Sequence, residues 1–572
     1  MRDIVRVDHD IPARMRDGTL LYSDIYYPEG HGPFPAILMR LPYDKSNGQD
    51  YVFYHPSRFA RQGYIVVVQD VRGRWRSEGE FYPFRNEIAD GYDTVEWVAR
   101  LPSCTGKVGM YGFSYVGFTQ LSAALGRPPH LTCISPAMTG SQCYEGWAYE
   151  GGAMSLALDL SWAVELSTGE AHRRHLDDLE RELWNAFMHM RDWYGYLPLS
   201  DIPILKDCKI APYFFDWLDH PIYDQYWKQW SIDLRWKDIS VPCLFTGGWY
   251  DAFRDGTLRN FAGIGEFGGD EKPRGFQKLL MGPWYHVPWA PLTGQMDFGE
   301  EARNIVSEDH LRWFDYWLKG IENGISADPP VRLFVMGKDI WREEESWPPR
   351  GVRNSEFYFH SVKGANSLNG DGTLDRSVPT DEPPDLFVYN PRSPVPSLGG
   401  HSCCFPTVSP MGPFDQREVE LQNQVLVYTS GPLEEGILVA GPVTARLWAT
   451  SSAVDTDFTV KLMDVYPDGR AMNLTEGIVR ARYRISVEKP LLLTPGEVYE
   501  FQIQVGNTCN YFSPGHRIRV EVSSSNFPHW DRNTNSGNDI GKDGFSELCV
   551  ATQVIFHDAQ RPSHLSLPII VG

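Results

Sequence analysis

The segment from Val108 to Gly117, which reads VGMYGFSYVG, constrains the fold of this 572-residue chain more than any other segment. A short apolar run leads into a glycine-containing turn at Ser114, and a segment compatible with a helix follows. This is the layout of a nucleophile elbow, in which a sharp strand-to-helix turn exposes a serine hydroxyl. The usual pattern is G-x-S-x-G, but Val116 stands where the second glycine is expected. By itself the motif is weak, because glycine and serine meet by chance at the ends of many strands.

Two later segments supply candidate partners for Ser114. The run from Val241 to Phe245 is predicted to be a buried strand, and a glycine loop that contains Asp251 follows it. The apolar run that begins at Lys278 ends in a loop that contains His286. The order serine, acid, histidine is that of α/β-hydrolases. In parallel α/β sheets, ligands bind beyond the carboxyl ends of the strands, where all three side chains are predicted to lie.

The chemistry of acyl transfer explains why these residue types are needed together. A serine hydroxyl is a poor nucleophile until a base removes its proton. A histidine is that base, and the acid fixes its tautomer and stabilises the imidazolium. Taken alone, His286 is one of 16 histidines and is more often structural, and Asp251 is more often a turn acid. At strand ends and in this order, the three residues predict a catalytic triad.

Several further motifs occur in order along the chain. They are Leu41-Pro-Tyr-Asp-Lys45, Asp70-Val-Arg-Gly-Arg74 with Ser77-Glu-Gly79, Gly112-Phe-Ser-Tyr-Val-Gly117, Gly248-Trp-Tyr-Asp251, Gly282-Pro-Trp-Tyr-His286 and Ala453-Val-Asp-Thr-Asp-Phe458. Through them the chain resembles, over almost its whole length, the cocaine esterase / α-amino-acid ester hydrolase family of serine hydrolases, which is related to the X-prolyl dipeptidyl peptidases. That family uses G-x-S-Y-x-G, so the resemblance makes Val116 the expected residue.

The resemblance implies roles for the candidate site residues. It implies a catalytic triad in which Ser114 is the nucleophile, His286 is the base and Asp251 is the partner of the base. It also implies an oxyanion hole made by the phenol O–H of Tyr43 and the backbone N–H of Tyr115. Trp147 and Trp162 would form the walls of an acyl pocket. Phe253, two residues after the catalytic acid, is predicted as the third wall. An oxyanion hole needs donors preset where charge develops. Without the resemblance, Tyr43 is better explained as a turn residue after Pro42.

The pattern of apolar residues divides the chain into four parts. We predict that residues 1–144 and 241–352 form the two parts of an α/β-hydrolase domain, and that residues 145–240 form a helical lid inserted between them. We predict residues 353–572 to be a β-sandwich, for which the resemblance implies a jelly roll. Strands that alternate with helices indicate a parallel α/β sheet. Short alternating segments between Pro and Gly turns indicate an all-β sandwich. Asp90 is predicted to cap a helix, and Asn533–Asp543 to form a loop at the surface or at the rim of the active site.

Composition limits the partners and the compartment. The net charge of -21 and the pI of about 5.2 make nucleic acid a poor candidate partner. No apolar run approaches the roughly 18 residues of a membrane span, and the N-terminus lacks the apolar region of a signal peptide. The nine cysteines include the adjacent pair Cys403-Cys404 and no C-x-x-C. They predict reduced thiols and a cytoplasmic location.

The sequence predicts neither a metal nor a cofactor. No cluster of His, Cys and acidic residues has the spacing of metal ligands, and the nearest pair, His172 and His175, is better explained as the charged surface of a helix. The expected function is therefore that of a carboxylic ester hydrolase. It would act on a small-molecule ester with an apolar or aromatic acyl group through an acyl-enzyme on Ser114.

Two alternatives remain at this point. One is an α-amino-acid ester hydrolase, acylase or dipeptidyl peptidase that cleaves amide bonds. Such enzymes with α-amino substrates need carboxylates for the ammonium group, and Arg254 stands close after Asp251 where the α-amino-acid ester hydrolases place acids. Glu145 and Glu150 could partly substitute for them. The other alternative is a non-enzymatic binder with a lectin-like sandwich, against which the intact triad argues. A homo-oligomer and the physiological substrate are left open.

Overall fold

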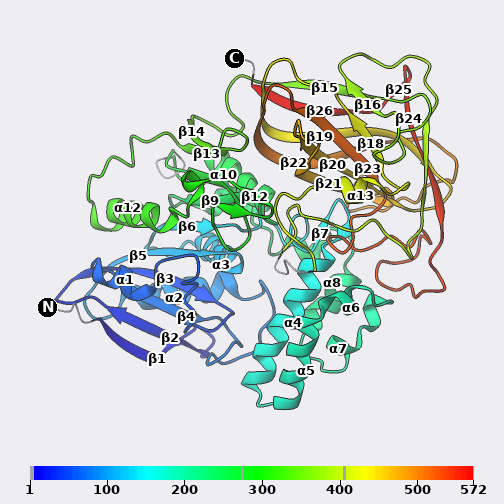
Figure 1. Ribbon diagram of the computed structural model, residues 1–572. Coiled ribbons are helices and arrows are strands. Elements are labelled where there is room, and N and C mark those ends of the chain that lie inside the picture. The colour runs from blue at the N-terminus through cyan, green and yellow to red at the C-terminus, as the bar shows by residue number, and fades with distance from the viewer. Residues whose placement is uncertain (1–4, 272–274, 404–407, 571–572) are drawn as a thin grey trace.

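The computed structural model describes residues 5–271, 275–403 and 408–570. The first half is built on a ten-stranded sheet with the strand order β1-β2-β4-β3-β5-β6-β9-β10-β13-β14 (Figure 1). These strands are β1 (Arg6–Arg14), β2 (Leu20–Tyr27), β3 (Phe34–Leu41), β4 (Ile65–Asp70), β5 (Cys104–Phe113), β6 (Leu131–Ala137), β9 (Leu244–Tyr250), β10 (Lys278–Tyr285), β13 (Val331–Val335) and β14 (Ile340–Glu344). Neighbouring strands from β4 to β13 run parallel, and β1, β2 and β14 are antiparallel at the two edges.

Helices cover both faces of this sheet. They are α1 (Pro56–Arg61), α2 (Glu87–Ala99), α3 (Tyr115–Leu125), α10 (Arg254–Phe267) and α12 (Val306–Lys319). Successive side chains of a strand point to opposite faces. Leu38 of β3 accordingly lies in one core with apolar residues of α2, α3 and α10, whereas Met39 lies in a second core with residues of α1 and α12. This two-sided burial fixes the strands and leaves their carboxyl ends free to carry polar groups.

The insertion between β6 and β9 consists of helices joined by loops, with one short hairpin near its start. It contains the hairpin β7 (Tyr149–Glu150) and β8 (Ala153–Met154), and the helices α4 (Leu156–Arg173), α5 (Asp177–Met188), α6 (Met190–Tyr194), α7 (Pro203–Lys206), α8 (Pro212–Asp219) and α9 (Gln225–Lys228). Figure 1 shows α4 and α5 side by side, projecting away from the sheet. A distant loop holds the start of this insertion. The N–H of Met154 donates to the carboxylate of Asp531 at 2.7 Å, and the N–H of Ala157 donates to the carbonyl of Pro528 at 3.0 Å.

The last third of the chain forms the all-β part. Its sheet contains β15 (Val352–His360), β16 (Thr373–Asp375), β17 (Asp385–Tyr389), β18 (Leu426–Thr429), β19 (Ile437–Ser451), β20 (Asp457–Val465), β21 (Ala471–Arg480), β22 (Tyr499–Phe512), β23 (Arg517–Ser523), β24 (Ala551–Asp558), β25 (Arg561–Pro562) and β26 (His564–Ile570). The shorter elements of the chain are β11 (Leu292–Thr293), β12 (Met296–Asp297) and α13 (Arg417–Glu420). The predicted fold class is confirmed: an α/β-hydrolase fold with a helical lid insertion and a C-terminal jelly roll. The exact domain limits stay a prediction.

One prediction about a helix start is wrong. Helix α2 begins at Glu87 with Asn86 at its N-cap, so Asp90 lies inside the helix and does not cap it. The carboxylate of Asp90 instead accepts two hydrogen bonds from the guanidinium of Arg72, at 2.8 and 2.6 Å. Arg72 belongs to the loop after β4, so Asp90 helps to fix that loop, and this tertiary ion pair replaces the local role expected of it.

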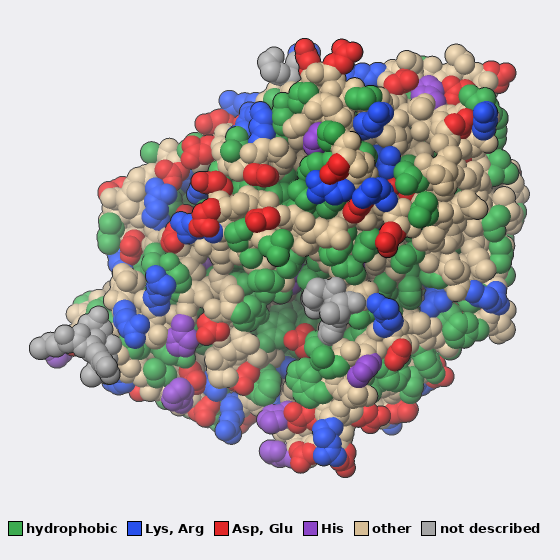
Figure 2. Space-filling model, viewed as in Figure 1, with side chains coloured by type: hydrophobic (Ala, Val, Ile, Leu, Met, Phe, Trp, Pro, Cys, Tyr) green, Lys and Arg blue, Asp and Glu red, His purple; other side chains and the backbone are tan. Residues whose placement is uncertain are grey.

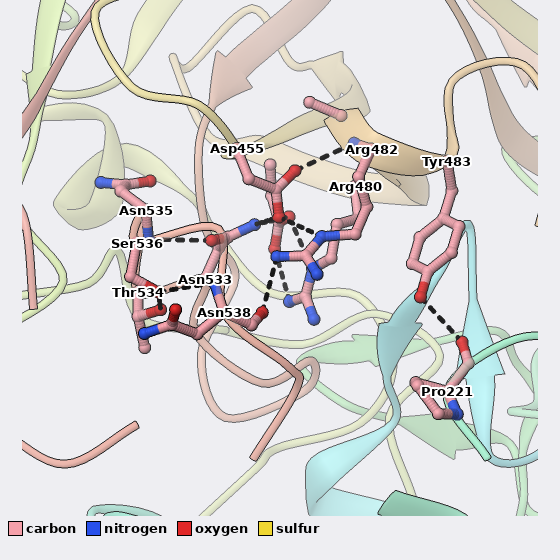
Figure 3. A network of polar contacts seen from close by, with 12 residues as sticks. Pro221, Asp455, Arg480, Arg482, Tyr483, Asn533, Thr534, Asn535, Ser536 and Asn538 are labelled. Atoms are coloured by element: carbon pink, nitrogen blue, oxygen red, sulfur yellow. Dashed lines mark hydrogen bonds and ion pairs between the residues drawn. The ribbon is translucent and has the colours of Figure 1, made fainter. Parts of the chain in front are cut away.

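The polar stretch Asn533–Asp543 is a loop, as predicted, but only part of it lies at the surface. Asn538, Asp539 and Lys542 are exposed, whereas Asn533, Asn535 and Asp543 are buried. Figure 3 shows the polar contacts of the buried part. The side-chain amide of Asn533 donates to Asp455 at 3.0 Å and to Asp457 at 2.8 Å. Arg480 and Arg482 hold the same two carboxylates, at 2.9 and 2.7 Å. Buried carboxylates need partners of this kind. The polar side chain of Asn533 therefore pairs with buried carboxylates in the interior of the all-β part, while the middle of the loop faces the surface.

Two further predictions concern the compartment. Within the described ranges, no helix is long and apolar enough to cross a membrane. Seven cysteines of the described ranges are free thiols, but Cys403 is disulfide-bonded. The prediction of reduced thiols is therefore wrong at Cys403, and Cys404 lies outside the described residues. The cytoplasmic location stays a prediction.

Candidate active site

Ser114 lies at the junction of β5 and α3, where the sequence predicts the elbow. Its backbone has φ of 64° and ψ of -131°, a conformation that non-glycine residues rarely adopt and that costs about 1–3 kcal/mol. The N–H of Ser114 donates to the carbonyls of Ala137 and Met138, at 3.0 and 3.1 Å, and both carbonyls lie at the end of the neighbouring strand β6. Strand β6 thus holds the strained turn in place at the carboxyl edge of the sheet.

Close packing explains why the second glycine of the motif is displaced by one position. Gly112 has φ of 136°, and a Cβ there would lie 2.2 Å from a methyl carbon of Val116. A Cβ on Gly117 would lie 2.8 Å from the carbonyl oxygen of Ala137. The chain therefore needs glycine at 112 and 117, while the side chain of Val116 fills the space that Gly112 leaves.

Asp251 and His286 follow the neighbouring strands β9 and β10. Strand β9 begins and ends later than the predicted run from Val241 to Phe245, because it extends from Leu244 to Tyr250. Strand β10 begins at Lys278 as predicted and ends at Tyr285, so the glycines of the two motifs lie within the strands. The Nδ1 atom of His286 lies 2.7 Å from Oδ1 of Asp251, and both side chains are buried. A carboxylate at this distance accepts the Nδ1 proton, which leaves Nε2 as the acceptor nitrogen of the ring.

Tyr43 follows β3 and lies beside the elbow. Its hydroxyl is within hydrogen-bonding reach of Ser114 and accepts the indole N–H of Trp162 at 3.0 Å. Burial raises the pKa of Tyr43 well above its ordinary value. The phenol therefore keeps its proton through the neutral range and can donate it to a developing negative charge.

The loop after β4 fixes the position of Tyr43. The guanidinium of Arg74 donates to the carbonyl of Pro42 at 2.8 Å and to the carbonyl of Leu166 in α4, also at 2.8 Å. The backbone N–H of Lys45 donates to the buried carboxylate of Asp70 at 2.7 Å. Asp70 and Arg74 begin and end one sequence motif. That motif therefore ties the segment around Tyr43 to the sheet on one side and to the helical insertion on the other.

Tyr115 contributes its backbone, because its side chain is directed into the core. Its hydroxyl donates to Glu87 at 2.9 Å, and Glu87 pairs with the buried guanidinium of Arg40 at 2.7 Å. Tyr115 is the first residue of α3. The first N–H groups of a helix have no carbonyl one turn earlier to bind. The N–H of Tyr115 is thus a backbone donor next to Ser114.

A cavity of about 470 Å³ brings most of the predicted residues together. Its lining includes Tyr43, Ser114, Trp147, Trp162, Phe253 and His286. Asp251 stands behind His286, where it is fully buried. The centroid of the Phe253 ring lies 4.5 Å from that of Trp147 and 5.3 Å from that of His286. The aromatic walls therefore rest directly against the imidazole. On the face shown in Figure 2, hydrophobic side chains gather around a hollow near the centre of the molecule.

Sequence reasoning missed a carboxylate in this cavity. Glu165 of α4 lines the cavity. Burial raises the pKa of Glu165 to about 7, although the nearby Arg74 and His286 act to lower it. Glu165 follows Trp162 by three residues, so the two side chains share one face of the helix. This spacing could have predicted that Glu165 lies beside the acyl pocket. Trp184 of α5 also lines the cavity and is 46% exposed.

The acids proposed from the sequence as substitutes lie elsewhere. Glu145 and Glu150 line a second cavity of about 490 Å³, between the α/β part and the all-β part. The guanidinium of Arg254 turns away from the catalytic cavity and bonds to Asp255 and to Thr475 of the all-β part. Among the described residues that line the catalytic cavity, Glu165 and Glu180 supply the carboxylates.

Comparison with known proteins agrees with this geometry. Residues 17–288 match the model of the X-Pro dipeptidyl-peptidase (S15) family, and residues 323–566 match the X-Pro dipeptidyl-peptidase C-terminal non-catalytic domain. The chain is 39% identical to the cocaine esterase of Rhodococcus sp. (strain MB1 Bresler), over 99% of this chain and 98% of that protein. The chain belongs to the cocaine esterase / α-amino-acid ester hydrolase family.

Other proteins match over similar lengths. A putative serine esterase of Mycobacterium bovis is 26% identical, over 97% of this chain and 94% of that protein. Among solved structures, an aminopeptidase from a marine sediment Thaumarchaeota archaeon superposes with a TM-score of 0.83 at 25% identity, over 100% of this chain and 97% of that one. An α-amino acid ester hydrolase superposes with a TM-score of 0.80 at 25% identity, over 99% and 97%. As a member of this family, the chain is a serine hydrolase.

Proposed function

We propose that the chain is a carboxylic ester hydrolase that forms an acyl-enzyme on Ser114. In this proposal His286 is the base and Asp251 is its partner. The observation that carries the proposal is the 2.7 Å bond between His286 and Asp251 at the edge of a cavity that Ser114 also lines. A serine is activated when a base with a fixed tautomer is within reach of its hydroxyl.

The proposed reaction uses the same groups in both of its halves. Oγ of Ser114 attacks the ester carbonyl while Nε2 of His286 takes the hydroxyl proton. The negative charge on the carbonyl oxygen is met by the phenol of Tyr43 and the N–H of Tyr115. When the tetrahedral intermediate collapses, His286 gives its proton to the leaving alcohol, and the acyl group stays on Ser114. Water then attacks the acyl carbonyl while His286 takes a proton from it. When the second intermediate collapses, the bond between the acyl carbon and Oγ of Ser114 breaks, His286 returns the proton to Oγ, and the acid leaves.

The aromatic walls favour an apolar or aromatic acyl group. Trp147, Trp162 and Phe253 contribute flat apolar surfaces beside Ser114. The ring centroids of Trp147 and Trp162 are 5.6 Å apart, so the two walls support each other. Sites for small molecules are typically lined by apolar and aromatic side chains, with a few polar groups that fix orientation.

A second candidate function is hydrolysis of substrates with an α-amino group, including amides. It is favoured by the names of the two solved relatives, an aminopeptidase and an α-amino acid ester hydrolase, and by the carboxylate of Glu165 in the catalytic cavity. Against it, the acids Glu145 and Glu150 lie at the second cavity. Rates on matched p-nitrophenyl esters and p-nitroanilides, with and without an α-amino group, separate the two functions.

Covalent labelling tests the main proposal directly. A fluorophosphonate probe reacts with an activated serine, so we expect one label per chain and a modified peptide that contains Ser114. The Ser114→Ala variant should remain unlabelled while its circular dichroism spectrum matches that of the parent. A label on any other serine would contradict the assignment, and absence of a label on the parent would favour a binding protein.

A further inference from the structure

Four ionisable side chains meet where the helical insertion joins the all-β part. Glu150 belongs to hairpin strand β7, and Glu476 belongs to β21. His401 lies in the loop between β17 and β18, and His529 lies between β23 and β24. His401 and His529 are each 4% exposed, and Glu476 is 3% exposed. Such burial of ionisable groups requires compensation by partners or by a bound ion.

The two carboxylates of this cluster, Glu150 and Glu476, approach different ring nitrogens of His401. Oε2 of Glu150 lies 3.0 Å from Nε2 of His401. On the other side, Oε1 of Glu476 lies 3.0 Å from Nδ1 of His529 and 3.7 Å from Nδ1 of His401. Glu476 therefore stands behind both imidazoles. One ligand atom from each of Glu150, His401 and His529 lies within 4.8 Å of the other two.

Within the described ranges, two buried atoms of the cluster have no hydrogen-bond partner. They are Nδ1 of His401 and Oε2 of Glu476. The ammonium group of Lys461 lies 3.9 Å from Oε2 of Glu476, beyond hydrogen-bonding distance.

We propose that Glu150, His401 and His529 bind a divalent transition-metal ion such as Zn²⁺, and that Glu476 orients the two imidazoles from behind. Imidazole nitrogen and carboxylate oxygen are ligands that Zn²⁺ takes in proteins. A ligating histidine almost always donates its other ring N–H to a carboxylate or carbonyl, as the bond from His529 to Glu476 provides. The two carboxylates also supply the charge that balances a dication.

The distances require only small rotations of these side chains. A tetrahedral ion with bonds of about 2.0–2.2 Å holds its ligand atoms about 3.3–3.6 Å apart. Oε2 of Glu150 and Nε2 of His401 are already 3.0 Å apart. The other distances between the ligand atoms of the three residues are at most 4.8 Å, and they shorten when the imidazole rings turn toward the ion. An ion needs a path of entry, and the second cavity supplies it. That cavity is lined by Glu150, His401 and the exposed side chains of Gln502 and Gln504.

The proposed ion would join two parts of the chain beside the catalytic cavity. Glu150 comes from the helical insertion, and both histidines come from the all-β part. A small pocket is lined by Glu150, His401 and His529 together with Trp147 and Cys403, which also line the catalytic cavity. The ion is therefore proposed as a structural clamp behind the acyl-pocket wall, and the chemistry at Ser114 does not use it.

Metal binding to the full-length chain tests the proposal. The protein is dialysed against a chelator and then against chelator-free buffer, and Zn²⁺ is titrated by calorimetry. We expect one strong site per chain and a rise in Tm with Zn²⁺. His529→Gln should abolish the strong site, and Glu476→Gln should weaken it about 10- to 100-fold. His220→Gln is the matched control, because His220 also pairs with a carboxylate, Asp224, at 2.7 Å but has no second imidazole beside it.

A second measurement needs no variant and so remains decisive if the substitutions disturb folding. Co²⁺ added to the stripped parent protein should give the visible absorption bands of a low-coordinate ion with imidazole ligands, and excess Zn²⁺ should bleach them. The proposal is overturned if the parent binds no Zn²⁺ strongly, if His529→Gln binds as the parent does, or if His220→Gln alone loses the site. In each of those cases the four side chains form only a proton-sharing ion-pair network.

Discussion

Two cavities of almost equal volume, the catalytic cavity and the interface cavity, differ in the side chains around which they are built. The catalytic cavity, of about 470 Å³, is walled by aromatic rings around a few polar groups. The interface cavity, of about 490 Å³, combines apolar side chains with carboxylates, guanidinium groups and amides that come from distant parts of the chain. Size alone therefore does not identify the active site. What distinguishes the catalytic cavity is a strained serine at a strand end and a histidine–carboxylate pair beside it.

The two cavities also differ in how their polar groups are held in place. In the catalytic cavity, Ser114 and His286 directly follow the buried strands β5 and β10, so the sheet sets their positions. At the interface cavity, Glu150 and His401 come together only when the all-β part docks on the insertion. Matched substitutions in the two cavities should therefore separate catalytic effects from effects on stability.

The largest expected effect is on the nucleophile. Ser114→Ala should lower kcat for p-nitrophenyl esters by roughly 10⁴-fold or more, because attack through a serine hydroxyl is lost. Ser155→Ala is the matched change at the small pocket beside the histidine cluster, where Ser155 is buried, and it should leave kcat within about twofold of the parent. If Ser114→Ala keeps more than a few per cent of the parent kcat, the proposed mechanism is wrong.

The next effect concerns the oxyanion donor. Tyr43→Phe should lower kcat by roughly 100- to 1000-fold for every ester tested, with little change in KM, because the bond is used mainly in the transition state. Tyr483→Phe is the matched control, since Tyr483 lines the interface cavity and donates to the carbonyl of Pro221 at 3.0 Å. A change in KM alone for Tyr43→Phe would remove Tyr43 from the oxyanion hole.

A smaller effect is expected at the pocket wall. Phe253→Ala should weaken discrimination between benzoate and acetate esters by about 1–3 kcal/mol in kcat/KM. Phe253 is a cleaner choice than Trp162, because Trp162 also donates to the hydroxyl of Tyr43. Leu258→Ala removes an apolar side chain that lines the interface cavity and should affect both esters equally. Equal losses on both esters for Phe253→Ala would show that Phe253 is core and not pocket.

The smallest effect compares two carboxyl groups, one in each cavity. Burial raises the pKa of both Glu165 and Glu145 to about 7. Between about pH 4.5 and pH 7 the folded state holds a proton that the unfolded state has released, so the stability of the parent falls as pH rises through this window. The Tm difference between Glu165→Gln or Glu145→Gln and the parent should therefore become more positive from pH 4.5 to pH 8.

Substrate charge separates these two groups. Once ionised, Glu165 places a negative charge in the catalytic cavity. The kcat/KM for a choline ester, relative to its uncharged 3,3-dimethylbutyl isostere, should therefore rise from pH 6 to pH 8 in the parent and in Glu145→Gln. The ratio should stay flat in Glu165→Gln. A ratio that does not depend on pH in the parent would show that Glu165 does not face the bound alcohol or acyl group.

The sequence predicted the parts of the site that local patterns encode. The elbow at Ser114 and the strands before Asp251 and His286 follow from apolar runs and glycines, and the structure has a strand before each residue, although β9 ends at Tyr250 and not at the predicted Phe245. Asp90 was misassigned because a long-range bond from Arg72 outweighs its capping tendency. The cluster of His401 with Glu150 could not be predicted, since no local spacing links residues that far apart in the chain.

The bonds from Met154 and Ala157 to the loop near Asp531 have a consequence for biosynthesis. Ser114 leaves the ribosome hundreds of residues before Asp531 does. Domains generally fold as units during translation, the N-terminal ones first. The sheet with its elbow can therefore assemble early, while helix α4 lacks the loop that anchors its first turn. The nascent chain accordingly carries Ser114 without a finished cavity, and under the proposed mechanism we expect ester hydrolysis only after the segment that contains Asp531 has been translated.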